Sequence, residues 1–275
     1  GISSYSLSQT SFDCSQKGLH TVSVTATDEA GNEGSCETTI HVVDSVRPEV
    51  TCRDTLLLLD ELGQASLTPD DLLVTSSDAC GVTLQTLSQT SFDCADPDSL
   101  LLTLTVTDQS DRSGSCVSRV TLLDTIAPQA RCADIHLYLD GSGEATLLPA
   151  SLDAGSTDNC GIANRSVASG GFSCANLGNQ SVQLQIEDFR GNTSFCESIV
   201  SIRDTITPTA ICRDTFVFLD GQGQGMITPD MIDAGSFDQC GLTEWGVDQD
   251  VVTCADGDTA LITLQVADAG GNIAT

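Results

Sequence analysis

The chain has 275 residues, of which 39 are Asp or Glu and only 10 are Lys or Arg, so its formal net charge is −29 at pH 7. A negatively charged surface repels nucleic acid and anionic membranes, which excludes both as partners. No run approaches the 18 consecutive apolar residues of a transmembrane helix, so we expect no membrane span in these residues.

An exact repetition organises the sequence. The octapeptide LSQTSFDC occurs at residues 7–14 and again at 87–94, and it belongs to a repeat of 80 residues. Every cysteine falls into one of four series: Cys14, Cys94, Cys174 and Cys254; Cys36, Cys116 and Cys196; Cys52, Cys132 and Cys212; Cys80, Cys160 and Cys240. Seams of the type DTIAP begin at Asp44, Asp124 and Asp204. We predict a partial module at 1–44, complete modules at 45–124 and 125–204, and a partial module at 205–275.

Within each module, apolar and polar residues alternate in the pattern of half-buried strands. After the linker come an apolar stretch (LLLLD, HLYLD or FVFLD), a Gly-containing turn and a short strand that ends at Pro69, Pro149 or Pro229. Two long alternating runs follow, joined by the turns DEAGN, DQSDR, DFRGN and DAGGN. No helical pattern of useful length appears. The sequence therefore predicts an all-β fold of tandem immunoglobulin-like β-sandwich modules of 80 residues with internal disulfides.

Four cysteines in each small module are typical of a disulfide framework formed in an oxidising, extracytoplasmic compartment. A strand predicted at 99–107 would hold Cys94 and Cys116 about 30 Å apart, which argues against that pair and so against Cys52 with Cys80. We therefore favour a nested pattern, in which the first strand is tied to the last and a local hairpin is closed. It pairs Cys52 with Cys116, Cys80 with Cys94, Cys132 with Cys196, Cys160 with Cys174, and Cys240 with Cys254. Cys14, Cys36 and Cys212 then have partners outside these residues or on another chain.

Thirty of the 39 acidic residues are Asp, and many recur where three elements of a sandwich meet: the linker, the B–C loop and the F–G loop. The predicted sets are Asp44, Asp78, Asp108 and Asp111; Asp124, Asp158, Asp188 and Asn192; and Asp204, Asp238, Asp268 and Asn272. Converging carboxylates repel one another, and Ca²⁺ accepts about six to eight oxygen ligands from such groups. We predict structural Ca²⁺ at these junctions. The alternative is that the residues only cap their own turns.

The order of motifs DTIAP, Cys, LDGSG, STDNCG, FSC, a strand ending in D-x-x-G-N, and Cys resembles the hyalin-type (HYR-like) immunoglobulin repeat. It is most similar to the version in giant surface adhesin and filament proteins of gliding or filament-forming marine bacteria. The resemblance covers the whole chain. It implies a secreted or surface-attached stalk, with other copies of the chain, adjoining repeats and a cell-surface ligand as partners. DQSDR at 108–112 lacks the Gly-Asn pair and LLVTSSDAC at 72–80 lacks the LDAGS motif, so we expect weaker cation binding in module 45–124.

The histidines give no indication of catalysis. His20, His41 and His136 each replace an ordinary strand residue of the repeat, and the spacing implies no Ser or Cys partner for any of them. We therefore expect no enzyme and no catalytic or cofactor-binding residue. The sequence favours an extracellular structural and adhesive stalk or filament for cell-surface attachment or capture, rigidified by Ca²⁺. The alternative is an ion-dependent carbohydrate- or protein-binding module whose loops form the receptor site.

Overall fold

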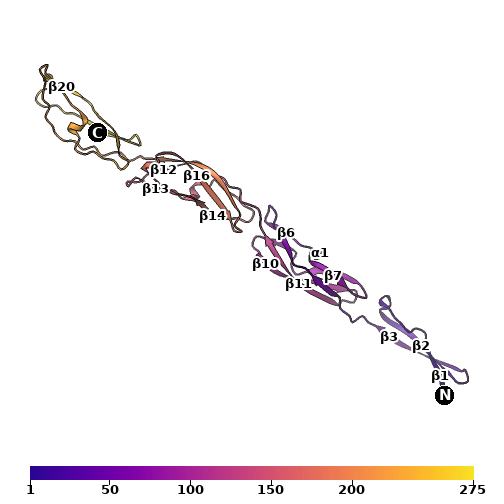
Figure 1. Cartoon of the computed structure of the whole chain (residues 1–275). Coiled ribbons are helices and arrows are strands. Elements are labelled where there is room, and N and C mark those ends of the chain that lie inside the picture. Colours follow the sequence, from indigo (N-terminus) through magenta and orange to yellow (C-terminus); the bar gives the residue numbers. More distant parts are fainter. The chain divides into compact units, whose positions relative to one another are not determined.

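The computed structural model describes all 275 residues, and its only helices are single turns (Figure 1). The chain divides into two compact units, Gly1–Thr125 and Ile126–Thr275. Each unit contains β-sheets stacked into sandwiches and closed by disulfides. This confirms the predicted class of tandem immunoglobulin-like modules, while the residue boundaries of the modules stay predictions.

The first unit begins with a three-stranded antiparallel sheet in the order β1-β2-β3 and continues with a complete sandwich. Its elements are β1 (Ile2–Leu7), η1 (Cys14–Gln16), β2 (Gly18–Asp28), β3 (Glu33–Val42), β4 (Glu49–Cys52), β5 (Thr55–Leu58), β6 (Gln64–Ser66), α1 (Pro69–Leu72), β7 (Leu73–Ser77), β8 (Val82–Leu87), β9 (Ser91–Asp93), β10 (Ser99–Asp108) and β11 (Ser113–Leu123). Pro69 begins α1, as expected for a residue that fits the first helical position.

The sandwich of module 45–124 consists of a four-stranded sheet, β5-β11-β10-β8, covered by the short pairs β4-β7 and β6-β9. β5 pairs with β11 in parallel, and the other pairs are antiparallel. Alternate residues of β10 (Leu102, Leu104 and Val106) are at most 3% exposed, as the two-residue period predicts. Leu72 and Phe92 are buried in the same core, so one thin apolar layer holds the module together.

The second unit repeats this arrangement in module 125–204, with the sheet β12-β17-β16-β14 and the pair β13-β15. Its elements are β12 (Ile135–Tyr138), β13 (Glu144–Thr146), α2 (Pro149–Leu152), β14 (Ile162–Val167), β15 (Gly171–Ser173), η2 (Cys174–Asn176), β16 (Gly178–Asp188), β17 (Thr193–Arg203), β18 (Gln224–Met226), α3 (Pro229–Ile232), β19 (Leu242–Val247), β20 (Val251–Thr253), η3 (Cys254–Asp256), β21 (Leu264–Asp268) and β22 (Ile273–Ala274). The last five strands form the sheet β19-β21-β22 and the pair β18-β20.

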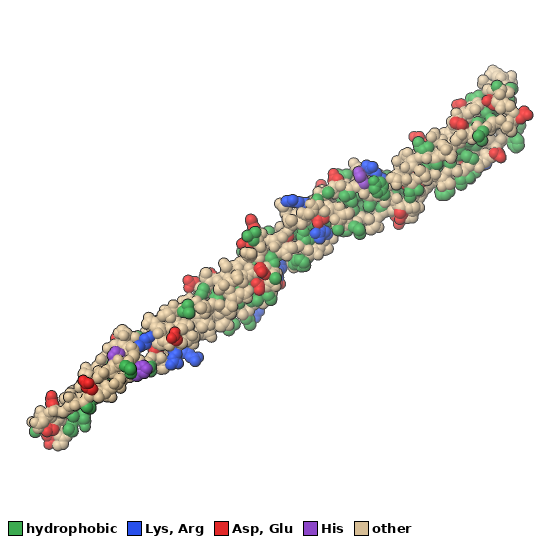
Figure 2. All heavy atoms as spheres, turned by 180° about the vertical axis from the view of Figure 1, so that it is seen from behind, with side chains coloured by type: hydrophobic (Ala, Val, Ile, Leu, Met, Phe, Trp, Pro, Cys, Tyr) green, Lys and Arg blue, Asp and Glu red, His purple; other side chains and the backbone are tan.

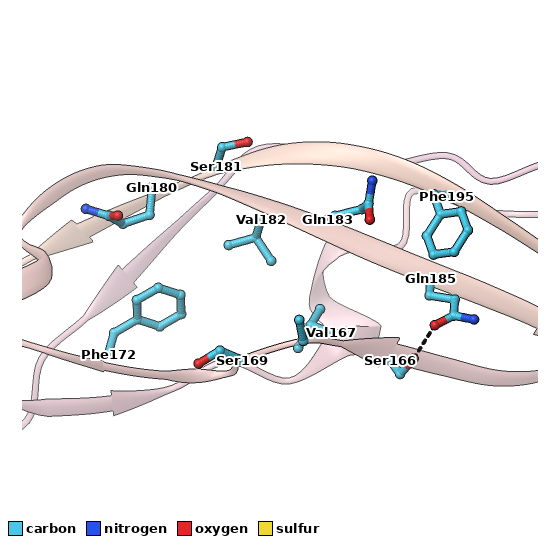
Figure 3. A pocket seen from close by; sticks show the side chains of 11 residues that line it. Ser166, Val167, Ser169, Phe172, Gln180, Ser181, Val182, Gln183, Gln185 and Phe195 are labelled. Atoms are coloured by element: carbon cyan, nitrogen blue, oxygen red, sulfur yellow. Dashed lines mark hydrogen bonds between the residues drawn. The ribbon is translucent and has the colours of Figure 1, made fainter.

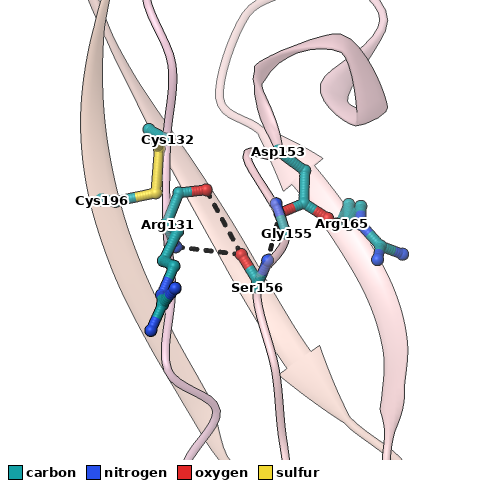
Figure 4. A network of polar contacts seen from close by, with 7 residues as sticks. All are labelled: Arg131, Cys132, Asp153, Gly155, Ser156, Arg165 and Cys196. Atoms are coloured by element: carbon teal, nitrogen blue, oxygen red, sulfur yellow. Dashed lines mark hydrogen bonds and ion pairs between the residues drawn. A yellow bond between two sulfur atoms is a disulfide. The ribbon is translucent and has the colours of Figure 1, made fainter.

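The two complete modules differ along the edge that carries the linker. In module 45–124, β4 pairs with β7 over four residues, whereas the same region of module 125–204 makes only isolated bridges. There the LDAGS motif supplies polar contacts instead (Figure 4). The Ser156 hydroxyl accepts a hydrogen bond from the Arg131 backbone N–H at 3.0 Å, and Asp153 accepts one from Arg165 Nε at 2.6 Å. The change from LDAGS to LLVTSS therefore replaces a polar network with a strand pair.

The same network fixes the charge state of Asp153. Burial raises the pKa of this carboxyl, but hydrogen bonds from Ser156 and the nearby Arg165 guanidinium outweigh burial and lower the pKa to about 2. Asp153 is therefore ionised at any physiological pH and carries the charge that its pair with Arg165 requires.

The turn between β10 and β11 contains a backbone conformation that suits glycine. Asp111 has a φ of 59°, in the left-handed region, and the equivalent turns place Gly31, Gly191 and Gly271 there with φ of 84° to 87°. The Cβ of an L-residue meets the following carbonyl oxygen in this region, at a cost of about 1–2 kcal/mol that Asp bears better than most residues.

Replacing Asp111 by glycine is expected to raise the free energy of unfolding of the chain by about 0.5 kcal/mol. The gain is the left-handed strain that Gly avoids, reduced by the larger backbone entropy of Gly in the unfolded chain. Urea denaturation measures it. Asp111→Ala removes the same charge but keeps a Cβ, so an equal gain in that variant would assign the effect to charge and contradict the backbone explanation.

Candidate metal centre and disulfide-linked junctions

Two disulfides lie within modules, as predicted. Cys52 bonds to Cys116 and Cys132 bonds to Cys196, each with 5.8 Å between the Cα atoms. Cys116 lies in β11, on the four-stranded sheet, and Cys52 ends β4 in the covering layer. The bond therefore ties the two layers of the sandwich together.

The other three predicted pairs are wrong. Cys80 bonds to Cys14 and not to Cys94, and Cys174 bonds to Cys240 and not to Cys160. Cys254, which was expected to bond to Cys240, is free and exposed. Cys94 and Cys160 are also disulfide-bonded. Cys14 and Cys174 lie in the single 3₁₀ turns η1 and η2, and each is joined to a loop of the following module.

Strand length explains the correction. Cys80 lies just before β8 and Cys94 just after β9, so the six residues of β8, about 20 Å long, separate the ends of the module at which they lie. A strand between the two positions thus opposes a bond of Cys80 with Cys94, just as it opposes one of Cys94 with Cys116. The prediction failed because it assumed that each module pairs its cysteines within itself.

Three cysteines are free and exposed: Cys36, Cys212 and Cys254. Bonds within modules span 64 residues, and bonds between modules span 66. Counted from these three residues with the same spacings, the partner positions fall outside residues 1–275. The expectation of an outside partner is wrong for Cys14 and stays a prediction for Cys36 and Cys212.

Carboxylates converge beside each of these between-module disulfides. We call Asp44, Asp78 and Asp108 the first acidic junction, and Asp204, Asp238 and Asp268 the second. Carboxylate oxygens of Asp44 and Asp78 lie within 4.8 Å of each other, as do those of Asp204 and Asp238. The neighbouring sulfurs of Cys80 and Cys240 are in disulfides and cannot act as thiolate ligands. The available donors are therefore oxygens, which hard cations prefer.

Each aspartate uses one oxygen to hold its own turn. Asp78 Oδ1 accepts a hydrogen bond from the Cys80 backbone N–H at 2.7 Å, and Asp238 Oδ1 accepts one from the Cys240 backbone N–H at 2.7 Å. Asp108 Oδ1 accepts bonds from two backbone N–H groups of the β10–β11 turn. The turn-capping alternative is thus correct for one oxygen of each of these residues.

The second oxygen of several of these aspartates has no partner. Oδ2 is buried and accepts no hydrogen bond in Asp78, Asp108, Asp204 and Asp238. Asp108 is 1% exposed and Asp204 5% exposed. An unpaired buried carboxylate oxygen is costly because it has lost its water and gained nothing in return. Each junction thus has two such oxygens, from two chain segments, that could donate to a Ca²⁺ ion.

The pKa of Asp238 reflects repulsion among these carboxylates. Burial raises the pKa of Asp238, and the carboxylates of Asp204 and Asp268 raise it further, against the lowering effect of the hydrogen bond from Cys240. The second acidic junction therefore holds its negative charge at a cost to folding, which a cation would offset.

Asn272 binds the turn of the second acidic junction to the linker. Its amide nitrogen donates to Asp268 Oδ2 at 2.9 Å and to the backbone oxygens of Asp204 and Ile206 at 3.2 Å each. A Cβ at Gly270 would lie 2.8 Å from the Asp204 backbone oxygen, so glycine permits this close approach. In the first acidic junction, Arg112 takes the position of Asn272 and these contacts are lost.

The only lysine of the chain lies beside the first acidic junction. Lys17 Nζ donates to Ser110 Oγ at 3.0 Å, and Ser110 Oγ donates to Asp44 Oδ2 at 3.3 Å. The equivalent of Lys17 beside the second acidic junction is Leu177. An ammonium group therefore partly compensates the charge of the first junction only. Neither the motifs nor the spacing of the sequence pointed to this contact.

The remaining predicted ligands are placed as follows. Asp111 is exposed on its turn. Asp124 belongs to the first compact unit, whereas Asp158, Asp188 and Asn192 belong to the second. Asp188 is 2% exposed and accepts hydrogen bonds from the Asn192 backbone N–H at 2.9 Å and its side-chain amide at 2.7 Å. A cation shared by these four residues stays a prediction.

A shallow groove of about 340 Å³ lies on module 125–204. Figure 3 shows Phe172 and Phe195 at its two ends, with Gln183 and Gln185 between strands, and Gln185 lies 3.5 Å from the Ser166 hydroxyl. None of the lining residues is charged. The groove shares no residue with the acidic junctions.

The surface agrees with the composition. Figure 2 shows Asp and Glu side chains scattered over the visible face of both units, with few Lys or Arg among them. No helix in the structure has the length and apolar character that crossing a bilayer requires.

Fold and junctions together define a class: tandem immunoglobulin-like modules joined by disulfides between consecutive modules. No protein-family model and no curated protein matches the chain, so the hyalin-type resemblance rests on the motifs alone. The solved structures found are extracellular cadherin domains. Domains 1–4 of protocadherin gamma B7 have 13% identity and a TM-score of 0.31, covering 95% of this chain and 82% of that one.

Two further structures are similar to the same degree. The protocadherin gamma B4 extracellular domain has 16% identity and a TM-score of 0.34, covering 96% of this chain and 56% of that one. The human desmocollin-1 ectodomain has 10% identity and a TM-score of 0.26, covering 96% and 64%. At these identities and TM-scores, neither ligands nor function can be transferred to this chain.

Proposed function

We propose that the chain is part of an extracellular structural and adhesive stalk or filament, in which Ca²⁺ at the acidic junctions stiffens the connection between modules. One observation carries the proposal: the linker, a disulfide and several carboxylates meet at the same end of a module. Buried, unpaired Oδ2 atoms of Asp204 and Asp238 lie beside the bond from Cys240 to Cys174.

An extracellular location is supported by the cysteines. Ten of the 13 are disulfide-bonded, and bonds of this number form and persist in oxidising compartments. The charge of −29 and the single lysine keep such a chain soluble and free of nucleic acid. Partners are then adjoining repeats of the same polypeptide, other copies of it, and a ligand on a cell surface that the stalk attaches to or captures.

The mechanism is mechanical. Asp44 and Asp204 belong to linkers, whereas Asp78 and Asp238 belong to loops of the module that follows. Residues of both kinds would hold one ion, which would supply positive charge among carboxylates that otherwise repel. Bending at the linker would separate these ligands, so their joint binding opposes it. Pro48 and Pro208 restrict the linker backbone further.

The alternative of an ion-dependent carbohydrate-binding module has less support. The groove of module 125–204 is lined by neutral residues, and none of them belongs to an acidic junction. A sugar bound through an ion would require oxygen donors and a ligand-sized depression at the same place. In this chain they are in different places.

Calcium binding tests the proposal by equilibrium dialysis of the 275-residue chain with Ca²⁺. We expect saturable binding at about 0.1–1 mM, the range of extracellular modules. Lys17→Leu should tighten the first acidic junction by about threefold to tenfold, because it removes a neighbouring positive charge. Lys17→Arg keeps the charge and is the matched control. No saturable binding up to 10 mM, a concentration about tenfold above that range, would remove Ca²⁺ from the proposal.

A further inference from the structure

The disulfides of each unit form overlapping loops. In the first unit, the loop closed by Cys14 and Cys80 overlaps the loop closed by Cys52 and Cys116 between residues 52 and 80. In the second unit, the loop of Cys132 and Cys196 overlaps the loop of Cys174 and Cys240 between residues 174 and 196. Every peptide bond within 14–116 and within 132–240 therefore lies inside at least one closed loop.

Each kind of disulfide spans the part of the chain that the other kind leaves outside its loop. The bond of Cys52 with Cys116 begins after the linker at 44–48, and only the bond of Cys14 with Cys80 spans that linker. The linker at 204–208 likewise lies outside the loop of Cys132 with Cys196 and inside that of Cys174 with Cys240. Within-module bonds secure the sandwiches, and between-module bonds secure the linkers.

We propose that this covalent arrangement makes each unit tolerant of backbone breaks between its outermost joined cysteines and limits its extension under force, so that cleavage at the linker does not part it and unfolding of a module lengthens it to only a fraction of its backbone length. The property follows from which cysteines are joined. Only its biological value rests on the proposed stalk function, since an extracellular stalk is exposed to proteases and to tension.

The disulfides greatly reduce the length that an unfolded module can reach. Cys14 and Cys116 are 102 residues apart along the backbone (116 − 14), which is about 350 Å when fully extended. The route through both disulfides contains only the 28 residues between Cys52 and Cys80 (80 − 52), about 95 Å. To this are added two bonds with Cα–Cα separations of 5.2 and 5.8 Å. Complete unfolding of the module thus leaves these points less than a third of the full backbone length apart.

The experiment is a controlled cut in the full 275-residue chain. The recognition sequence of a site-specific protease is inserted between Ser45 and Val46, and a second protein carries it between Thr205 and Ile206. After cleavage and alkylation of free thiols, each protein is expected to run as one band in SDS without reductant and as two bands after reduction. Two bands without reductant would overturn the proposal.

Cys14→Ser combined with Cys80→Ser provides the matched control. In this variant the cut at residue 45 should separate the fragments without reductant, while the cut at residue 205 should not, because the bond of Cys174 with Cys240 remains. Retention of both fragments at the first cut would show that another bond spans the linker and would contradict the inference.

Peptide mapping of the unmodified protein keeps the test decisive if an inserted site prevents folding. Without reduction, we expect the peptide that contains Cys80 to be joined to the peptide that contains Cys14; finding it joined to the Cys94 peptide would overturn the proposal. Neither the gel nor the mapping depends on Ca²⁺ or on a surface ligand. Failure of the covalent inference is therefore distinguishable from failure of the proposed function.

Discussion

Replacing Cys132 and Cys196 by serine is expected to destabilise module 125–204 by about 4 kcal/mol, the loop-entropy value for a bond that spans 64 residues. Domains of this size have a total stability of only about 5 kcal/mol. The variant should therefore be largely unfolded in this module at 37 °C. Hydrogen exchange of the β16 and β17 amides, followed by mass spectrometry, measures the loss within the module itself.

The local structure makes this bond more important than its counterpart. In module 125–204 the segment before Cys132 has no strand, and it is held by two isolated bridges, Gln129 with Thr157 and Cys132 with Asp153, and by the hydrogen bonds of Arg131 to the LDAGS motif. In module 45–124, β4 has a four-residue strand pair with β7 in addition to its disulfide. We therefore expect Cys52→Ser with Cys116→Ser to cost less than the pair at 132 and 196.

The free cysteines provide the control for that comparison. Cys36→Ser and Cys254→Ser change exposed thiols outside any bond and should leave exchange rates unchanged. Protection of β16 and β17 equal to that of the unmodified protein, in the variant without the 132–196 bond, would show that the apolar core suffices and that the disulfide adds little.

Removing Ca²⁺ with a chelator is expected to lower the melting temperature of the chain by about 6–20 °C from its value in 10 mM Ca²⁺. A ligand at about ten to a hundred times its dissociation constant adds roughly 1.4–2.7 kcal/mol, and each kcal/mol shifts the melting temperature of a small domain by about 4–8 °C. Asp204→Asn combined with Asp238→Asn should abolish the part of the shift due to the second acidic junction. Differential scanning calorimetry in Ca²⁺ and in chelator measures both.

The pH dependence gives the same test a second readout. Because burial and neighbouring carboxylates raise the pKa of Asp238, its ionised form destabilises the folded chain, and this penalty is relieved as pH falls through the raised pKa. In chelator, this contribution to stability should therefore improve on mild acidification, and in Ca²⁺ the improvement should vanish.

Asp220→Asn, at an exposed turn of the same module, is the control that should leave the Ca²⁺ shift intact. Equal melting curves with and without Ca²⁺ would contradict the prediction.

The sequence was sufficient for the fold because the signal is local. A two-residue alternation such as Leu102, Leu104 and Val106 identifies which face of a strand is buried, and it does so without knowledge of any distant contact. The repeat then multiplies that signal, since each strand recurs 80 residues later with the same pattern. The convergence of Asp204 with Asp238 followed from loop positions in such a sandwich.

The pairing of cysteines and the asymmetry of the junctions required the three-dimensional structure. Cys80 bonds to Cys14 because the loop before β8 faces the preceding module, a relation between modules that no pattern within a module contains. Lys17 reaches Ser110 across 93 residues of sequence. Only the length of β8 gave a warning in advance, since it places Cys80 and Cys94 at opposite ends of their module.

The spacing of the disulfides affects how the protein must be made. Between the partners of every bond described here, two other cysteines lie in the sequence: Cys36 and Cys52 inside the loop of Cys14, and Cys80 and Cys94 inside that of Cys52. A chain exported from its N-terminus therefore presents the wrong thiol first each time. We therefore expect its maturation to require thiol–disulfide exchange, which takes about seconds to hours according to the oxidant and the isomerase.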